Sequence, residues 1–388
     1  MLAACSEAGA AQGEEQVGKM VDDLVPRVER AVGLPFESPP RVAVRTQEQV
    51  RTYLLHKLDE EMPPARLHGL TQAYRLFGML PDSVDLRSLL VALYTEQVVG
   101  YYDPDSATLY VVAGADPTVL KLTLAHELVH ALQGQHLLLD SLLSPDQDRD
   151  VRMAAQAVLE GQATVAALMV LMPDRHVADL PEFSDTYRRA IKQQHAQMPV
   201  FSSAPLIVQE SLVFPYLEGA DFVRAFLTEH GDTVPFGPRM PRSTEQVLHP
   251  DRYRDHDEPV QLVLAGTDSV VYSDGLGEFE TRVLLTTLIG VEATARAGAV
   301  AWGGDRYAVY DAGGGQYALV WWTAWDHPRA ADRFATLLQR EWPIRGAGER
   351  RVLIQREPVG GLPGVRLVDA PKGWSGWGAM PEVRRAGG

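Results

Sequence analysis

Apolar side chains recur every three or four positions through most of the first two thirds of the chain, a spacing typical of helices that bury one face. The clearest case spans residues 14–32, where the apolar face is made of Val17, Met20, Val21, Leu24, Val25 and Val28. The same spacing predicts two long, largely buried helices over residues 120–136 and 150–172. Shorter helices are predicted over residues 47–58, 65–79, 83–94, 185–197 and 208–229.

Alternating apolar and polar positions predict short strands between these helices. Residues 41–45 form one strand, and residues 98–102 and 108–112 form a hairpin that turns at residues 103–106. This hairpin comes directly before the helix at residues 120–136. The pattern therefore predicts a mainly helical domain that also contains a small mixed sheet.

The pattern changes near residue 260, where helices and longer strands begin to alternate. The expected elements are helices over residues 276–297 and 327–342 and strands over residues 306–311, 316–323, 351–355 and 365–369. Residues 379–388 are expected to form a frayed tail. The fold class is therefore α+β, with a tether at residues 1–16, a helical domain at residues 17–259 and a C-terminal α/β subdomain at residues 260–388.

Composition and charge narrow the range of partners. The 388 residues carry a formal net charge of −15 and no basic block, so nucleic acid is not an expected partner. For the same reason, charge alone is not expected to hold the protein on an anionic membrane surface. A single cysteine, Cys5, excludes an internal disulfide. No uninterrupted apolar run reaches the length of about 18 residues that a membrane-spanning helix needs.

The first residues contain a candidate lipid-attachment sequence. Leu2-Ala3-Ala4-Cys5 resembles the bacterial lipobox, which implies cleavage before Cys5 and attachment of a diacyl lipid to that side chain. A polar stretch at residues 6–16 follows, as in many lipoprotein tethers. Only Met1 precedes this sequence. Either the signal peptide starts further upstream and the protein is an extracytoplasmic lipoprotein of the cell envelope, or the likeness is accidental.

The helix predicted over residues 120–136 carries the most informative motif, His126-Glu127-Leu128-Val129-His130. Histidines four residues apart lie on the same face of a helix, so both imidazoles can bind one metal ion. Glu127 lies at the edge of that face, where it can hold a water bound to the metal. The alternative is a pair of buried histidines with ordinary hydrogen-bond partners, which leaves costly polar groups on an apolar helix without a function.

A hydrolytic zinc site needs three protein ligands and one open position, so a third ligand is expected further along the chain. Glu160 is the best candidate because an unpaired carboxylate is costly in the apolar helix predicted at residues 150–172. A surface glutamate is the alternative. Small residues in the same helix permit close approach of a neighbouring helix, and they are Ala157, Gly161, Thr164 and Ala167. Weaker candidate ligands lie in a polar loop and at its end: Asp140, Asp146, Asp148 and Asp150.

With these residues, the chain resembles the gluzincin branch of zinc metallopeptidases, and within it a group of bacterial zincin-like lipoproteins. The likeness is carried by residues 96–103, 125–136, 160–163, 243–253 and 302–307. It implies a zincin-like domain in which His126, His130 and Glu160 bind Zn²⁺ and Glu127 is the general base. It also implies that the edge strand at residues 98–102 holds an extended peptide substrate. Thr164 stands where many gluzincins have an aspartate that orients the first histidine, and its hydroxyl is a weaker acceptor.

The resemblance implies zinc-dependent hydrolysis of peptide bonds, with a histidine or tyrosine from a later segment stabilising the oxyanion. The expected residues are His249 and Tyr253, followed by Tyr101 and Tyr307. The competing hypothesis is a cell-surface binding or scaffold lipoprotein with a structural or vestigial zinc site. Residues 243–253 and 302–307 would then form a partner surface. An open fourth metal position favours the enzyme, whereas a position filled by a side chain such as His249 favours the scaffold.

Overall fold

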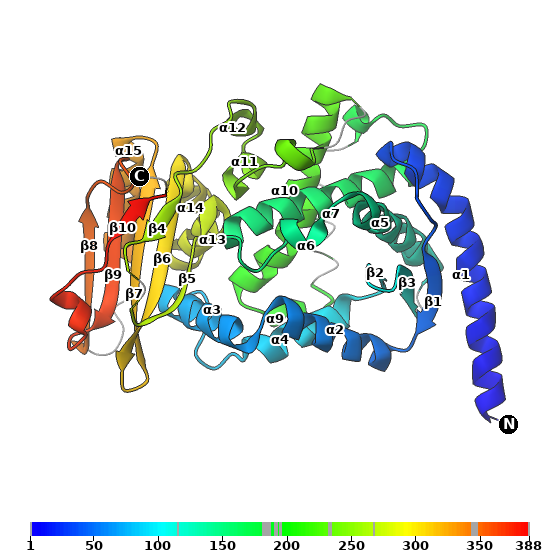
Figure 1. Cartoon of the computed structure of the whole chain (residues 1–388), viewed down its shortest axis with the longest axis horizontal. Helices are drawn as coiled ribbons and strands as arrows, with labels where there is room; N and C mark the ends of the chain where they lie inside the picture. The colour runs from blue at the N-terminus through cyan, green and yellow to red at the C-terminus, as the bar shows by residue number, and fades with distance from the viewer. Residues whose placement is uncertain are drawn as a thin grey trace.

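The protein has an α+β fold whose sheets lie toward opposite ends of an elongated molecule (Figure 1). The computed structural model describes residues 2–114, 116–180, 188–189, 193, 196–231, 235–266, 268–342 and 348–386. Most of the helix predicted at residues 185–197 lies outside the described residues.

The smaller sheet is mixed, as the sequence predicts. Its order is β1 (Arg41–Arg45), β3 (Thr108–Val112) and β2 (Gly100–Asp103). β1 runs parallel to β3, and β2 runs antiparallel to β3. β2 is therefore an edge strand, which fits the predicted hairpin.

Three long helices form a core with one face of this sheet. They are α1 (Leu2–Val32), α5 (Pro117–His136) and α7 (Arg149–Leu171). Their shared core includes Leu24, Leu109, Leu128 and Ala167. By length and composition, α7 is the one described helix apolar enough to cross a membrane, but 72% of its apolar stretch is buried in the fold. Packing inside the protein therefore explains its apolar character.

A further long helix, α10 (Leu206–His230), crosses α7 at very close range. A Cβ atom on Gly161 would collide with the backbone of Gly219, and one on Gly219 would collide with the backbone of Ala157. The small-residue positions on α7 therefore serve the close helix approach that the sequence predicts. The remaining helices of this part are α2 (Gln47–Glu61), α3 (Pro64–Phe77), α4 (Leu86–Gln97), α6 (Leu139–Leu142), α9 (Pro199–Ser203), α11 (Thr244–Leu248) and α12 (Pro250–Arg254).

The C-terminal part is built on a five-stranded sheet in the order β5 (Val270–Asp274), β6 (Trp302–Gly313), β7 (Gln316–Trp325), β9 (Gly364–Pro371) and β8 (Arg350–Arg356). Every pairing in it is antiparallel, so the α/β interpretation of this subdomain is wrong. The β6–β7 hairpin follows from the glycine turn, whereas the antiparallel pairing of β9 with β7 depends on long-range contacts that no local pattern reveals. The accompanying helices are α13 (Gly277–Ile289), α14 (Glu292–Ala299) and α15 (Pro328–Glu341).

Two sequence predictions fail in this part. The single helix expected over residues 276–297 is broken, because Gly290 adopts a left-handed conformation (φ 73°) that ends α13. The expected frayed tail instead forms β10 (Val383–Arg385), which pairs with β4 (Leu262–Leu264). This pairing depends on residues more than a hundred positions apart, so no local pattern reveals it.

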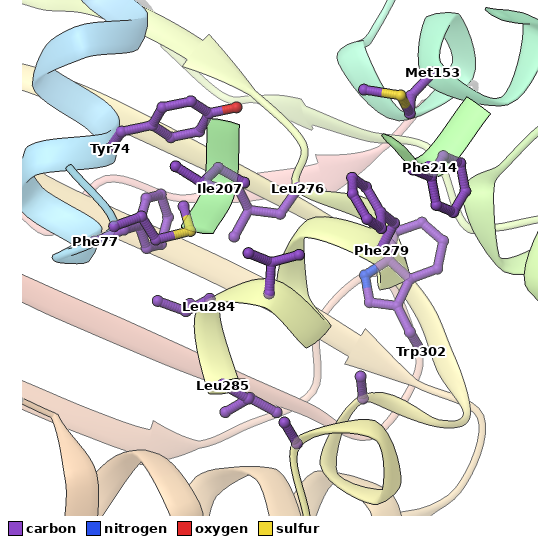
Figure 2. Close-up of a cluster of buried hydrophobic side chains, with 14 of the residues drawn as sticks. Tyr74, Phe77, Met153, Ile207, Phe214, Leu276, Phe279, Leu284, Leu285 and Trp302 are labelled. Atoms are coloured by element: carbon purple, nitrogen blue, oxygen red, sulfur yellow. The ribbon is translucent and has the colours of Figure 1, made fainter. Parts of the chain in front are cut away.

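The hydrophobic core is continuous across the predicted boundary at residues 259 and 260. Phe77 of α3 meets the rings of Tyr307 and Trp321 edge-on, with centroids 5.2 and 5.1 Å apart. Figure 2 shows α3 side chains and those of α13 in the same cluster, together with Phe214 of α10. The three-stranded sheet and the five-stranded sheet are linked through α7, which has side chains in this cluster and in the core beside the three-stranded sheet.

Candidate metal centre

Helix α5 fixes three of the candidate residues in one direction. Leu124, Leu128 and Leu132, spaced four residues apart, are fully buried. Their burial fixes which face of the helix points into the core. Asp116 caps its start by accepting the N–H of Val119 at 3.3 Å. On this anchored helix, the predicted histidines and Glu127 remain partly exposed.

The structure brings the three predicted ligands together. His126 Nε2 and His130 Nε2 lie 3.1 and 3.3 Å from Glu160 Oε2, and 3.1 Å from each other. Zinc bonds of about 2.0–2.1 Å in tetrahedral geometry would place ligand atoms roughly 3.3–3.4 Å apart. The three atoms therefore fit one face of a zinc tetrahedron. No second cluster of this kind occurs among the histidine, cysteine and acidic side chains that the structure describes.

The charged groups of this cluster shift one another's pKa values. Burial would raise the pKa of Glu160, but His130 and His126 together hold it well below its usual range. Burial lowers the pKa of His130, but the Glu160 carboxylate outweighs this effect and raises it to about 9. Burial raises the pKa of Glu127 in spite of both histidines. Glu127 is thus a more basic carboxylate than an exposed one and is better suited to accept a proton.

A glutamine orients the second histidine. Gln133 donates its amide N–H groups to the Leu159 carbonyl and to Gln162 Oε1, each at 2.9 Å. The Leu159 carbonyl can only accept, so the end of the Gln133 amide that bonds it is the nitrogen. The other end is Oε1, which lies 2.8 Å from His130 Nδ1 and accepts its N–H. His130 Nδ1 therefore carries a proton, which leaves Nε2 as the nitrogen that can bind a metal once its own proton is lost.

Thr164 does not support the first histidine. It is buried, and within the described part of the chain no hydrogen bond joins it to His126. The sequence indicates weak support at this position, and the structure agrees. Gln133, which the sequence analysis missed, is the orienting residue in this site.

The edge strand β2 lies against the candidate base. Tyr102 donates its backbone N–H to Glu127 Oε2 at 2.9 Å. Val99 accepts from Val112 of the neighbouring strand, so by antiparallel alternation the backbone groups of Gly100 and Tyr102 point away from β3. The free side of the predicted substrate strand therefore faces the cluster.

Tyr216 of α10 is a further group at the site. Its ring stacks on His126 with centroids 5.8 Å apart and planes 25° apart. Burial, then the charges of Glu160 and Glu127, hold the pKa of its hydroxyl well above the ordinary value. No sequence motif marks Tyr216, because it is a single tyrosine in an apolar helix. Its position three residues before Gly219, the helix-crossing glycine, is the only available signal.

The predicted oxyanion-stabilising residues are placed elsewhere. His249 Nε2 lies 2.8 Å from Glu278 Oε1, and the Tyr253 hydroxyl donates to the Arg239 carbonyl at 2.8 Å. Both lie at α11 and α12, beside α13 and away from α5 (Figure 1). The structure therefore does not bring His249 and Tyr253 to the cluster, because His249 pairs with α13 and the ring of Tyr253 packs against Phe222 of α10.

The reserve candidates are also turned away from the cluster. Tyr307 is fully buried against Phe77. The ring of Tyr101 stacks on Tyr53 with centroids 4.3 Å apart, on the opposite face of β2 from Tyr102.

A protein-family model described as a domain of unknown function (DUF8575) matches residues 265–361. The matched region covers most of the C-terminal sheet and none of the metal-centre residues. Neither a curated protein nor a solved structure matches the chain.

The two late motifs connect this C-terminal region to α7. Thr244 donates both its backbone N–H and its hydroxyl to Asp150, at the start of the helix that carries Glu160. The buried Asp305 carboxylate accepts four N–H groups, those of the Leu276 and Gly277 backbone and of the Trp302 and Trp321 indoles. Residues 243–247 and 302–305 are buried, so these parts of the two motifs are not available as a partner surface.

Glu245 in the first of these motifs gives a prediction about stability. Its side chain is 2% exposed, and burial together with the charge of Glu278 raises its pKa to about 9. The folded state then holds a proton that an unfolded glutamate, with a pKa of about 4.3, releases. This contribution to stability is complete below about pH 4 and is lost as the pH rises toward 9, by up to about 1.4 kcal/mol per pH unit. We expect Glu245→Gln to remove this slope in denaturant unfolding between pH 5 and about 9.

The exposed Glu229 offers a matched control for that measurement. Glu229→Gln should keep the wild-type pH dependence of the free energy of unfolding. If the free energy of unfolding changed with pH in the same way for wild type and Glu245→Gln, a protonated Glu245 would be contradicted.

Proposed function

We propose that this protein is a zinc-dependent peptidase that hydrolyses peptide bonds. The observation that carries the proposal is the convergence of His126 Nε2, His130 Nε2 and Glu160 Oε2 beside the carboxylate of Glu127. The three ligand side chains are still 16–21% exposed, and no fourth ligand joins them among the described residues. An open three-ligand site supports catalysis, since structural zinc sites are closed by four ligands. Attachment to the cell envelope through Cys5 remains a proposal from sequence alone.

Zinc held by these three residues would lower the pKa of a bound water and polarise the substrate carbonyl. Glu127 takes a proton from the attacking water as the water oxygen bonds to the carbonyl carbon. The carboxyl then returns that proton to the amine nitrogen as the C–N bond breaks. Burial favours this role because it makes the Glu127 carboxylate a better proton acceptor.

The edge strand β2 supplies a means of holding the substrate. An extended peptide can pair with the outward backbone groups of Gly100 and the carbonyl of Tyr102, which places its own backbone next to Glu127. Tyr216 lies across the site on α10, where its hydroxyl can donate to the carbonyl oxygen as that oxygen becomes negative. Main-chain pairing implies an extended segment as the substrate, with side-chain preference set elsewhere.

Removal of the Tyr216 hydroxyl tests its part in this scheme. We expect Tyr216→Phe to lower kcat about 10²–10³-fold, the usual effect of losing one oxyanion donor, while KM and bound zinc change little. Steady-state kinetics on a fluorogenic peptide and zinc analysis provide the measurements. Tyr253→Phe is the matched control and should retain wild-type kcat, because that hydroxyl bonds the Arg239 carbonyl. Equal kcat for wild type and Tyr216→Phe would remove this residue from the mechanism.

The proposed function itself is tested with the purified full chain. We expect about one zinc per chain, cleavage of a mixed peptide library, loss of cleavage after chelation, and recovery when zinc is restored. Tight zinc binding without cleavage of any peptide would favour the scaffold hypothesis. Failure to bind zinc would overturn the peptidase proposal and would leave the scaffold hypothesis only with a vestigial site.

A further inference from the structure

A cavity of about 230 Å³ lies behind the metal centre, between the end of α1, the middle of α7 and the end of α10. Its wall is largely apolar and includes Val32, Val165, Ala166, Met169 and Leu227. Two polar side chains interrupt this wall. Gln162 is 3% exposed, whereas Arg30 is exposed at the end of α1.

The amide orientation of Gln162 follows from its neighbours. The Leu159 carbonyl can only accept, so it fixes the nitrogen of Gln133, whose second N–H then needs an acceptor. Gln162 supplies its Oε1 at 2.9 Å. This leaves the NH₂ group of Gln162 without a hydrogen-bond partner in the described part of the chain, on a buried side chain that lines the cavity. The nitrogen of this NH₂ group is open to the cavity, so it can donate to an acceptor oxygen of a ligand bound there.

Arg30 adds a charge preference. Its Nε donates to the Pro26 carbonyl at 3.1 Å, and no carboxylate lies within ion-pair distance of its guanidinium among the described residues. A free cation beside an apolar cavity attracts anions and repels cations. The wall, the amide donor and the guanidinium together suit a short apolar chain that ends in a carboxylate.

We propose that this cavity is an effector site for small amphipathic carboxylates, with a carboxylate oxygen accepting from the Gln162 amide. The site is linked to the metal centre through Gln162, Gln133 and His130, which form one chain of hydrogen bonds. This linkage rests on the proposed zinc site, whereas the binding itself does not. Occupancy polarises each bond in turn and makes His130 Nε2 more basic, so zinc binds more tightly. By reciprocity, zinc tightens carboxylate binding by the same factor.

Hexanoate is the probe for binding, and hexylammonium, with the same tail and the opposite head group, is its matched control. Calorimetric titration of the zinc-free full chain should show saturable binding of hexanoate and none of hexylammonium. Gln162→Glu keeps the oxygen that accepts from Gln133 but replaces the donor with a negative charge. This variant should lose hexanoate binding at least about tenfold and gain binding of hexylammonium. Absence of hexanoate binding to the wild type, or an unchanged preference in Gln162→Glu, would overturn the site.

A second variant tests the cavity by volume. Ala166→Leu should block hexanoate binding while retaining a cooperative thermal unfolding transition. If this variant fails to fold, the charge exchange in Gln162→Glu still decides the question. The linkage is measured by chelator competition, where saturating hexanoate should lower the zinc dissociation constant about two- to threefold in the wild type. An unchanged zinc constant would overturn the linkage, and failure to bind zinc would overturn the proposed function while leaving the cavity test intact.

Discussion

Replacement of Glu127 by alanine is expected to lower kcat/KM for peptide hydrolysis about 10²–10⁴-fold, the contribution of a positioned general base. Bound zinc should not change, because the Glu127 carboxylate bonds the Tyr102 N–H and is not one of the three converging ligand atoms. The measurement is peptide cleavage and zinc content on the same preparation. Simultaneous loss of zinc would mean that Glu127 supports the metal centre and would leave its role as a base unproven.

Glu127→Gln separates the chemical role of this residue from its structural role. The amide oxygen of glutamine can still accept the Tyr102 N–H, so the contact between α5 and β2 is preserved. An amide cannot take a proton from water at neutral pH. We therefore expect Glu127→Gln to be as inactive as Glu127→Ala but more stable in denaturant unfolding. Substantial cleavage by the glutamine variant would contradict the proposed mechanism.

The ligand set is readable from sequence because its geometry is local. His126 and His130 share a helical face by spacing alone, whatever the rest of the chain does. Glu160 is identifiable because a carboxylate in the apolar α7 needs compensation. The structure brings the three atoms to within 3.1–3.3 Å of one another, and their role as metal ligands stays a prediction. The expected hairpin before α5 is present, and its strand β2 lies at the edge of the sheet.

Residues that reach the site only through tertiary contacts cannot be identified from local sequence patterns. Tyr216 reaches the site only because α10 crosses α7 closely, and nothing in its own segment indicates which face it occupies. The predicted His249 does not reach the cluster for the same reason, since a loop histidine can turn toward any neighbour and here pairs with Glu278. Gln133 was missed because a buried glutamine has no distinctive spacing. The fold shows the same division, with helices and hairpins predicted from local pattern and the β4–β10 pairing missed.

The crossing of α7 and α10 therefore decides how the site is completed, and Gly161→Ala tests it. The added methyl group would collide with the backbone of Gly219, which cannot move away as a flexible side chain would. We expect the free energy of unfolding to fall by about 3 kcal/mol, the upper range for overpacking. Separation of the helices also carries Tyr216 away from Glu160, so activity should fall beyond what the unfolded fraction explains.

Gly18→Ala is the matched control, because nothing lies within 4 Å of a Cβ there. That variant should gain about 0.5–1 kcal/mol from helix propensity. Equal stability of the two variants would mean that the close crossing does not exist. The structural reason for placing Tyr216 in the site would then be lost.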